Sequence, residues 1–443
     1  MSTDINSIND SSLYTMDQAV EFSRKNAGQI ALRVDSSGGV CKSFANYCTI
    51  LEKDPYLSGK IRLNLLSGRA MIRDVYWAPQ EHVLRDTDLS NLRRFTDSVY
   101  EISGGRDLRD AVGLIAEKNA FHPIRDELVK LVWDGHHRLG ELLPRYLGAE
   151  RSVLTTEITK LMLHGAIKRV MEPGIKYDSC IIFADSKQGT GKSSLCRFLA
   201  LKDEFFCDDL YDFGNTKNAF ETIRGHWICE LGEMIATRRT KDVNLIKGYI
   251  SRQNDSYRQP FGIFSEGFPR QTIFIGTSNQ PHCLPKDRTG NRRFVPVLCD
   301  GDKADVHPLA DEAETREYIR QCYAEAMVIG ESEGYRLDLD QEYHTELDAI
   351  RYGLTPDENS IGIIQNFLDT CEEDIVCSRM IWERAFQHSE EASPDEKELS
   401  RIAEVMNSSI RGWERYAGLS GTAKDSKYRF AYYGKQRAWQ RCA

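Results

Sequence analysis

The stretch S-C-I-I-F-A-D-S-K-Q-G-T-G-K-S-S-L-C-R-F-L-A, residues 179–200, is the part of the chain from which its fold can be read. Cys180–Ala184 is an apolar run of strand length, and after a polar loop Leu195, Phe198 and Leu199 have helical spacing. A glycine-containing loop between a strand and a helix directs backbone N–H groups at phosphate oxygens, and the helix N-terminus adds partial positive charge. The stretch therefore predicts a phosphate-binding loop in an α/β core.

Candidate nucleotide contacts follow from this loop. Lys192 can reach the terminal phosphates of a bound nucleotide, and the Ser193 hydroxyl can ligate Mg²⁺. Ser186 stands where the full pattern has glycine, so its Cβ is expected to strain or reshape the loop entrance and to change affinity without abolishing binding. A chance loop is the alternative, which the flanking strand and helix disfavour. The predicted nucleotide-binding residues are Gln188, Gly189, Thr190, Gly191, Lys192, Ser193 and Ser194.

Length and composition limit the class of protein. A chain of 443 residues is too long for one ordinary core, so two or three domains are expected. It has no run of eighteen apolar residues and no secretory signal, and its 12 cysteines are scattered singly. We therefore expect a cytoplasmic protein without a membrane partner or structural zinc. The net charge of −9 means that any nucleic-acid surface must be local.

The chain before the loop is predicted to be mostly helical. Residues 1–40 form an N-terminal segment, and residues 41–150 carry helical patterns with a strand pair between I-R-L-N-L-L and R-A-M-I-R-D-V-Y-W. Within this domain, adjacent His136 and His137 invite a metal interpretation, but no second ligand cluster is nearby and a solvated turn is favoured. The nucleotide core is assigned to residues 151–300.

Two acids follow a predicted strand downstream of the loop. Trp227–Cys229 is apolar, and Glu230 and Glu233 come after it. In phosphate-loop enzymes one such acid holds the Mg²⁺ shell and another orients or activates the attacking water. We assign Glu230 to the metal, together with Ser193, and Glu233 to the water. Two solvated glutamates are the alternative.

A strand tip and two arginines extend the predicted catalytic set. Thr272–Gly276 ends in T-S-N, and Asn279, at the tip of a strand between the two nucleotide motifs, can hydrogen-bond the attacking water or the γ-phosphate. Paired guanidinium groups at Arg292 and Arg293 suit a triphosphate in a neighbouring subunit, with a surface turn as the alternative. The candidate catalytic residues are Lys192, Glu230, Glu233, Asn279, Arg292 and Arg293.

Two further regions are candidates for nucleic-acid contact. Arg252, Tyr257 and Arg258 surround an aspartate in an aromatic loop that fits either nucleic acid or salt bridges between subunits. Residues 301–358 read as a helical lid or connector, and residues 359–443 predict three short helices and a basic, aromatic β ribbon, the order of a winged-helix module. Either DNA contact or a structural hairpin explains the ribbon. Its candidate DNA-binding residues are Lys427, Arg429, Lys435 and Arg437.

Several motifs together identify a resemblance. In order they are F-H-P-I-R-D, W-D-G-H-H-R-L, Q-G-T-G-K-S, W-I-C-E-L-G-E, F-P-R-Q-T-I-F-I-G-T-S-N and T-G-N-R-R-F-V-P-V. This succession, from Phe44 to Val297, resembles the virulence-associated protein E (VapE) family, phosphate-loop ATPases of phages and integrated mobile elements that are similar to superfamily 3 helicases. The resemblance implies an α/β fold with an AAA+-like core, and ATP with Mg²⁺ as ligands.

The resemblance also implies roles for individual residues. Lys192 and Ser193 would contact phosphate and Mg²⁺, and Glu230 with Glu233 would form the acidic motif. Asn279 would be the sensor. The finger candidates are Arg292 and Arg293.

Three functions are open at this point. The first is a DNA-dependent ATPase that translocates on or unwinds single- or double-stranded DNA during replication of a mobile element, as a homo-oligomer expected to be a hexameric ring. The second is an ATP-driven regulatory switch or scaffold without unwinding activity. The third, a small-molecule kinase, ranks last because it needs no sensor asparagine followed by paired arginines. No recognisable primase domain precedes the ATPase part, so a separate primase or polymerase is an expected partner.

Overall fold

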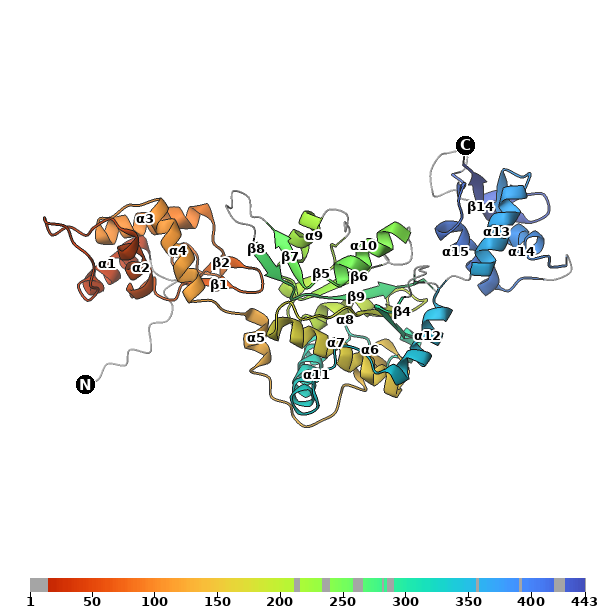
Figure 1. The fold of residues 1–443 in the computed structure, drawn as a ribbon, viewed down its shortest axis with the longest axis horizontal. Helices are drawn as coiled ribbons and strands as arrows, with labels where there is room; N and C mark the ends of the chain where they lie inside the picture. Colours follow the sequence, from red (N-terminus) through yellow and green to blue (C-terminus); the bar gives the residue numbers. More distant parts are fainter. Residues whose placement is uncertain are drawn as a thin grey trace. The chain divides into compact units, whose positions relative to one another are not determined.

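A computed structural model describes residues 15–210, 216–232, 240–257, 266–280, 283–284, 291–355, 358–389, 393–417 and 427–442. The chain is a mixed α/β protein, as predicted, and it divides into two units, Met1–Leu131 and Val132–Ala443. The predicted domain of residues 41–150 spans this division. Each unit is described by itself (Figure 1).

The first unit combines helices with a small antiparallel sheet. Its strand order is β1-β2-β3, and Ile61 pairs with Ile72 while Asn64 pairs with Arg69. This pairing confirms the predicted strand pair. The elements are α1 (Met16–Ala27), α2 (Phe44–Lys53), β1 (Ile61–Asn64), β2 (Arg69–Ile72), β3 (His82–Val83), α3 (Asp86–Tyr100), α4 (Arg106–Lys118) and α5 (Pro123–Leu128).

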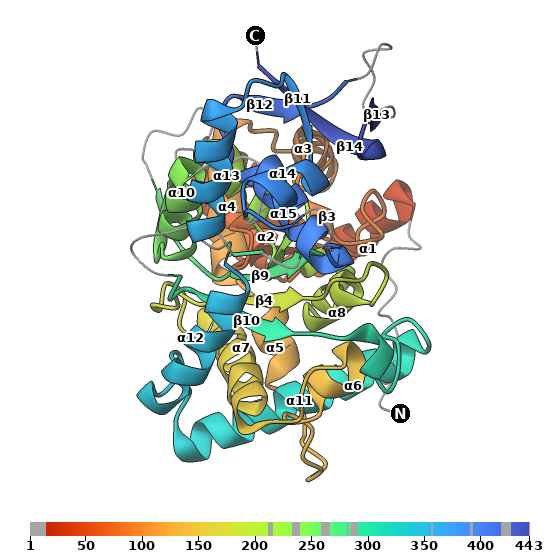
Figure 2. The same cartoon turned by 90° about the vertical axis from the view of Figure 1, so that its right-hand side faces the viewer.

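A five-stranded parallel sheet forms the centre of the second unit. Its strand order is β10-β4-β9-β6-β5, and Figure 2 shows β9, β4 and β10 side by side. In a parallel sheet all the carboxyl ends lie at one edge, so the residues that follow β4, β9 and β6 meet there. The strands are β4 (Cys180–Ala184), β5 (Phe206–Cys207), β6 (Ile228–Gly232), β9 (Ile273–Ser278) and β10 (Phe294–Leu298).

Helices cover both faces of this sheet, so nearly all residues of its strands are buried and most of them are apolar, without alternation. On one face Cys180 and Ile182 pack with apolar residues of α9 and α10. On the other, the buried Trp227 donates from Nε1 to the Ala166 carbonyl in α7 at 2.9 Å and stacks on Tyr323 of α11. The helices are α6 (Leu142–Leu147), α7 (Val153–Met171), α8 (Lys192–Leu199), α9 (Thr216–Ile223), α10 (Thr240–Ile250), α11 (Glu312–Glu333) and α12 (His344–Gly353).

The C-terminal residues form a module with its own apolar core, which includes Ile364, Ile381, Val405 and Trp439. Its sheet has the order β11-β14-β12, and β13 also pairs with β14. The elements are α13 (Glu358–Thr370), β11 (Ile375–Cys377), α14 (Ser378–Arg384), α15 (Glu396–Ser408), β12 (Trp413–Arg415), β13 (Lys427–Phe430) and β14 (Gly434–Arg441).

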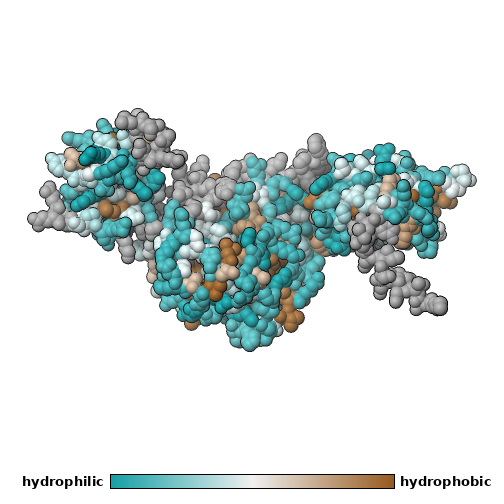
Figure 3. Space-filling view, turned by 180° about the vertical axis from the view of Figure 1, so that it is seen from behind, coloured by the Kyte–Doolittle hydropathy of each residue, from teal (hydrophilic) through white to brown (hydrophobic). Residues whose placement is uncertain are grey.

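The surface and the cysteines agree with the composition. Within the described parts of the chain, no helix is long and apolar enough to cross a membrane. Figure 3 shows a face on which hydrophilic residues predominate and apolar ones are scattered. The cysteines are free thiols, and burial raises the pKa of Cys180 to about 12, so this thiol packs as a small apolar side chain.

A buried histidine joins α7 to α11. His164 is fully buried, its Nδ1 accepts the Arg336 N–H at 2.9 Å, and its Nε2 lies 3.1 Å from the Ala326 carbonyl oxygen. Because a backbone N–H donates to Nδ1, the proton of the neutral ring is on Nε2. Burial is the main reason why the pKa of His164 falls to about 4.

We predict that this histidine makes the second unit sensitive to acid. The pKa in the folded state lies below the unfolded value of about 6.5, so the stabilisation is present above pH 6.5 and is lost as the pH falls toward 4. The free energy of unfolding should drop by roughly 3 kcal/mol across this range from His164 alone. Denaturant titrations at several pH values measure it. His164→Gln should remove this part of the pH dependence, and identical pH profiles for the two proteins would contradict the prediction.

Candidate nucleotide site

The predicted loop joins β4 to α8. Gly189 and Gly191 have φ angles of +74° and +86°, a region that L side chains rarely adopt. A Cβ on Gly191 would also lie 2.5 Å from Cδ of Pro308. Glycine is therefore required at Gly191 by its backbone angle and by its close neighbour.

Ser186 does not produce the strain that the sequence suggested. Among the described residues, the non-glycine positions with positive φ are Asp74, Glu101, Leu201 and Gln387, so the Cβ of Ser186 fits its backbone. Hydrogen bonds also hold the entrance of the loop in place. The buried Asp185 accepts the Lys187 N–H at 2.9 Å and the Gly301 N–H at 3.1 Å.

The loop lysine lies against the tip of β9. Lys192 is buried, and its Nζ donates to Asn279 Oδ1 at 2.8 Å, to Thr190 Oγ1 at 3.0 Å and to the Lys187 carbonyl oxygen at 3.0 Å. Strand β9 lies between β4 and β6, so Asn279 reaches the lysine from the neighbouring strand. The ammonium group therefore already has three acceptors, and a phosphate oxygen would have to replace at least one of them.

The serine after the lysine meets the predicted metal ligand. Ser193 Oγ donates to Glu230 Oε1 at 2.6 Å, and Thr277 Oγ1 donates to the same oxygen at 2.5 Å. Hydroxyl and carboxylate oxygens are ligands that Mg²⁺ prefers. The described residues contain no cluster of three or more His, Cys, Asp or Glu that could hold a metal. The pair therefore fits a Mg²⁺ ion whose remaining ligands are water and phosphate oxygens.

These groups line one cavity of about 340 Å³, a size that suits a small ligand. Of the predicted nucleotide-binding residues, Gln188 is exposed and does not line it, while the others do. Glu233 lies outside the described residues. The cavity is lined by Gly189, Thr190, Gly191, Lys192, Ser193, Ser194, Glu230, Gly232, Thr277, Asn279, His307 and Leu309.

Four of the lining residues were not singled out by the sequence: Gly232, Thr277, His307 and Leu309. Thr277 stands in the quoted T-S-N motif, and its pairing with Glu230 depends on β9 lying beside β6. His307 and Leu309 come from the segment after β10, for which the sequence carries no recognisable signal. Only the fold brings them to the loop.

The two candidate finger arginines lie at the opposite edge of the sheet. Their position precedes β10, and the Arg293 carbonyl accepts the N–H of Cys180 at the start of β4. The five residues of β4 span roughly 16 Å, so the pair cannot reach the cavity of its own chain. Arg293 Nε donates to Ser251 Oγ at 2.7 Å, and Arg292 is exposed.

The predicted basic loop begins at the same edge. It enters the hairpin of β7 (Asn254–Tyr257) and β8 (Glu266–Pro269). The buried Arg270 forms two bonds to Asp255, at 2.5 and 2.6 Å, and Arg252 lies 3.7 Å from the same carboxylate. The acid at the centre of this loop is thus paired within the chain. Tyr257 ends β7, but its side chain and all of Arg258 lie outside the described part.

The base of this hairpin is held by a second buried arginine. Arg169 donates to the Arg252 and Arg270 carbonyl oxygens at 3.3 Å and to the Tyr177 carbonyl oxygen at 2.8 Å. Burial lowers its pKa to about 10, so it stays charged at neutral pH. The hairpin therefore starts from a rigid base.

The basic ribbon of the C-terminal module presents its cations on one face. Lys427 pairs with Arg437, and Arg429 pairs with Lys435. Directly paired residues of antiparallel strands point to the same side, and like charges placed there repel one another. All four side chains are exposed. The ribbon therefore presents four like charges on one exposed face.

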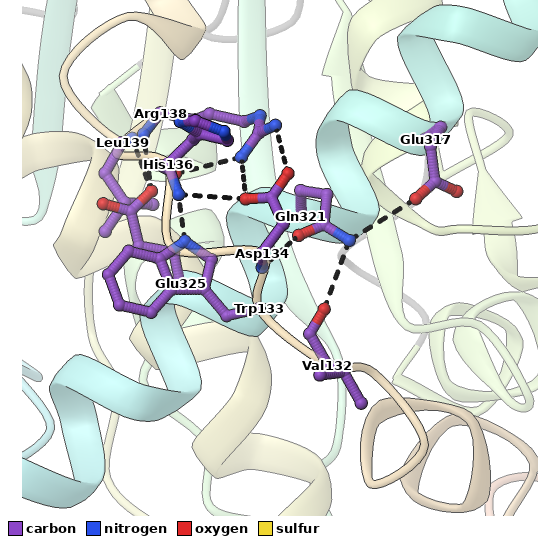
Figure 4. A network of polar contacts seen from close by, with 9 residues as sticks. All are labelled: Val132, Trp133, Asp134, His136, Arg138, Leu139, Glu317, Gln321 and Glu325. Carbon is purple, nitrogen blue, oxygen red and sulfur yellow. Dashed lines mark hydrogen bonds and ion pairs between the residues drawn. The ribbon is translucent and has the colours of Figure 1, made fainter.

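The two adjacent histidines belong to a loop that packs on α11 (Figure 4). His137 Nδ1 lies 2.8 Å from the buried Glu325. Glu325 also accepts the N–H groups of Arg138 and Leu139, as Figure 4 shows. The Arg138 guanidinium binds both oxygens of Asp134. The loop is thus held by hydrogen bonds, in agreement with the expected turn.

Comparison with known proteins gives a family match and structural neighbours. The model of the virulence-associated protein E-like domain matches residues 128–352, about half of the chain. No curated protein matches it. Among solved structures, the apo structure of the NrS-1 C terminal region is 12% identical over 86% of this chain and 96% of that one, with a TM-score of 0.42. Its A form has the same identity and coverage and a TM-score of 0.43.

Proposed function

The chain belongs to the virulence-associated protein E-like family, and from this premise we propose that it is a DNA-dependent ATPase. The proposed activity is that of a superfamily 3-like helicase in the replication of a phage or integrated mobile element. The proposed architecture is an AAA+-like phosphate-loop core with a C-terminal winged-helix module, assembled as a ring.

One observation carries the proposal. At the N-terminus of α8, Lys192 bonds to Asn279 at 2.8 Å and Ser193 bonds to Glu230 at 2.6 Å, all within one cavity. These are the four groups needed to bind a terminal phosphate, to complete a Mg²⁺ shell and to sense the phosphate. Lys192 and Ser193 open α8 after β4, Asn279 follows β9 and Glu230 lies in β6, so three neighbouring strands bring the four groups together.

The chain's own groups then have defined tasks. The N–H groups of the loop hold the β-phosphate, and Lys192 moves from its present acceptors to the terminal phosphate oxygens. Bound Mg²⁺ would neutralise the charge that develops on those oxygens. Asn279 is placed to orient the attacking water or to contact the γ-phosphate, and Glu233 remains the predicted base.

The positions of the two edges support the proposed ring. Arg292 and Arg293 lie at the amino edge of the sheet, a strand's length from the cavity of their own subunit. In a ring they would face the triphosphate of the next subunit and offer it a fork of donors.

DNA contact is proposed at two places. The hairpin loop of residues 253–259 would move along the strand as the subunits hydrolyse ATP. The four cations of the β13–β14 ribbon would bind phosphates of single- or double-stranded DNA. A switch or scaffold that uses the same ATP site without unwinding is the alternative that the experiment below distinguishes.

The test measures ATP turnover with and without single-stranded DNA, together with the mass of the assembly in ATP. We expect turnover that DNA stimulates and a ring of several copies. Lys192→Ala should lower turnover at least a hundredfold, because the terminal phosphates lose their cation. Lys176→Ala, at an exposed lysine, is the control. A monomer whose turnover ignores DNA would favour the switch, and absence of nucleotide binding would refute both.

Arg293→Ala should abolish turnover and leave ATP affinity nearly unchanged, because this arginine serves the neighbour's site. Mixing it with Lys192→Ala subunits makes the prediction sharper. Some interfaces of the mixed ring then join an intact Lys192 to an intact Arg293, so turnover should partly return. Steady-state ATP hydrolysis at varied mixing ratios measures this. No recovery, or lost ATP binding in Arg293→Ala alone, would mean that the arginine acts within its own subunit or has a structural role, such as its bond to Ser251.

The double variant Lys435→Ala with Arg437→Ala should weaken DNA binding and make it less dependent on salt. Each lost phosphate contact reduces the magnitude of the slope of log K against log salt by about one. Fluorescence anisotropy at several salt concentrations measures the slope. The exposed Arg411, in the same module but off the ribbon, supplies the control Arg411→Ala. An unchanged slope in the double variant would leave the ribbon a structural hairpin.

A further inference from the structure

The cavity at the loop has a second wall that no phosphate or metal role explains. It comes from the segment between η4 (Gly301–Lys303) and α11, which brings His307 and Leu309 against the loop. Pro308 between them is buried and occupies the space that a side chain on Gly191 would need. Loop and segment interlock, so this wall is a fixed part of the cavity.

Both ring nitrogens of His307 are engaged by backbone groups. The Leu309 N–H donates to Nδ1 at 3.2 Å, and Nε2 lies 3.2 Å from the Gly189 carbonyl oxygen. A backbone N–H donates only to an unprotonated nitrogen, so the neutral ring carries its proton on Nε2 and donates it to Gly189. Both ring nitrogens are occupied, so the part of this exposed side chain that a ligand can contact is the flat carbon surface of the ring.

Leu309 adds an apolar surface next to this ring. Its side chain lines the cavity and is still 51% exposed. Covering such a side chain with a flat apolar group removes it from water, which is favourable in proportion to the area covered. An imidazole face and a leucine suit an aromatic ring better than they suit a phosphate.

We propose that His307 and Leu309 form the nucleoside subsite of this cavity, which takes the base by stacking and apolar contact. The inference rests on the proposed function, because it assumes that the triphosphate occupies the polar wall. The base of the same molecule then continues past Gly189 onto the second wall. Nucleotide binding is thereby coupled to the segment that joins β10 to α11.

The composition of this wall also determines base selectivity. The polar side chains of the opposite wall are bonded to one another, Lys192 to Asn279 and Ser193 to Glu230. Neither His307 nor Leu309 offers a side-chain donor or acceptor to the edge of a base. Strong discrimination requires hydrogen bonds to that edge. ATP and GTP should therefore bind with affinities within about tenfold of each other.

Calorimetry with ATP, GTP and inorganic tripolyphosphate, each with Mg²⁺, tests the subsite in the full chain. Leu309→Ala keeps the backbone N–H that holds His307. It should weaken both nucleotides about tenfold and leave tripolyphosphate unchanged. Leu298→Ala is the matched control, because Leu298 is 52% exposed at the same sheet edge and does not line the cavity.

Three results would overturn the inference while the proposed function stands. They are unchanged nucleotide affinity in Leu309→Ala, an equal loss for tripolyphosphate, and a preference for ATP over GTP beyond a hundredfold. Failure of all three ligands to bind the unaltered chain would instead remove the proposed function, and this subsite with it.

Discussion

The parallel alignment of β4, β9 and β6 is the constraint on which the candidate site depends. Each strand places its polar residues at the same edge, and the hydrogen-bonded ladders set their separation. Lys192 and Asn279, 87 residues apart in the chain, come within 2.8 Å. Thr277 and Glu230 meet for the same reason. A shift of β9 by one residue would turn the side chains of Thr277 and, at the tip of the strand, Asn279 to the other face of the sheet.

The carboxyl edge and the amino edge of this sheet carry different candidate groups. The carboxyl edge gathers the loop, the acid and the sensor candidate. Arg293 lies at the amino edge, where its bond to Ser251 ties it to the short link between α10 and the hairpin strand β7. Arg293, which is proposed to reach a neighbouring subunit, and the β7–β8 hairpin, which is proposed to contact DNA, are therefore joined at the same edge of the sheet. This arrangement would let the state of one nucleotide site influence the hairpin of the adjacent subunit.

Sequence periodicity predicted the local elements well where burial imposes a clear pattern. The strand Cys180–Ala184 has the expected bounds, and the expected strand pair forms between β1 and β2. The backbone of Ser186 has no positive φ, so it lacks the strain that was expected there, because the requirement for glycine depends on φ, which residue type alone does not reveal. The expected change in nucleotide affinity stays a prediction. The roles assigned to Glu233 and Arg258 fall on residues outside the described part of the chain.

The sequence by itself determined the candidates for phosphate contact, because glycine, lysine and serine at that spacing, after a strand and at the start of a helix, are typical of phosphate-binding loops. It also determined the candidates Glu230 and Asn279, each at the end of an apolar run. The tertiary structure alone decided which groups face one another. The strand order makes Thr277 part of the site. The path of the chain after β10 adds the wall formed by His307 and Leu309. Those are contacts between distant residues, and no local pattern encodes them.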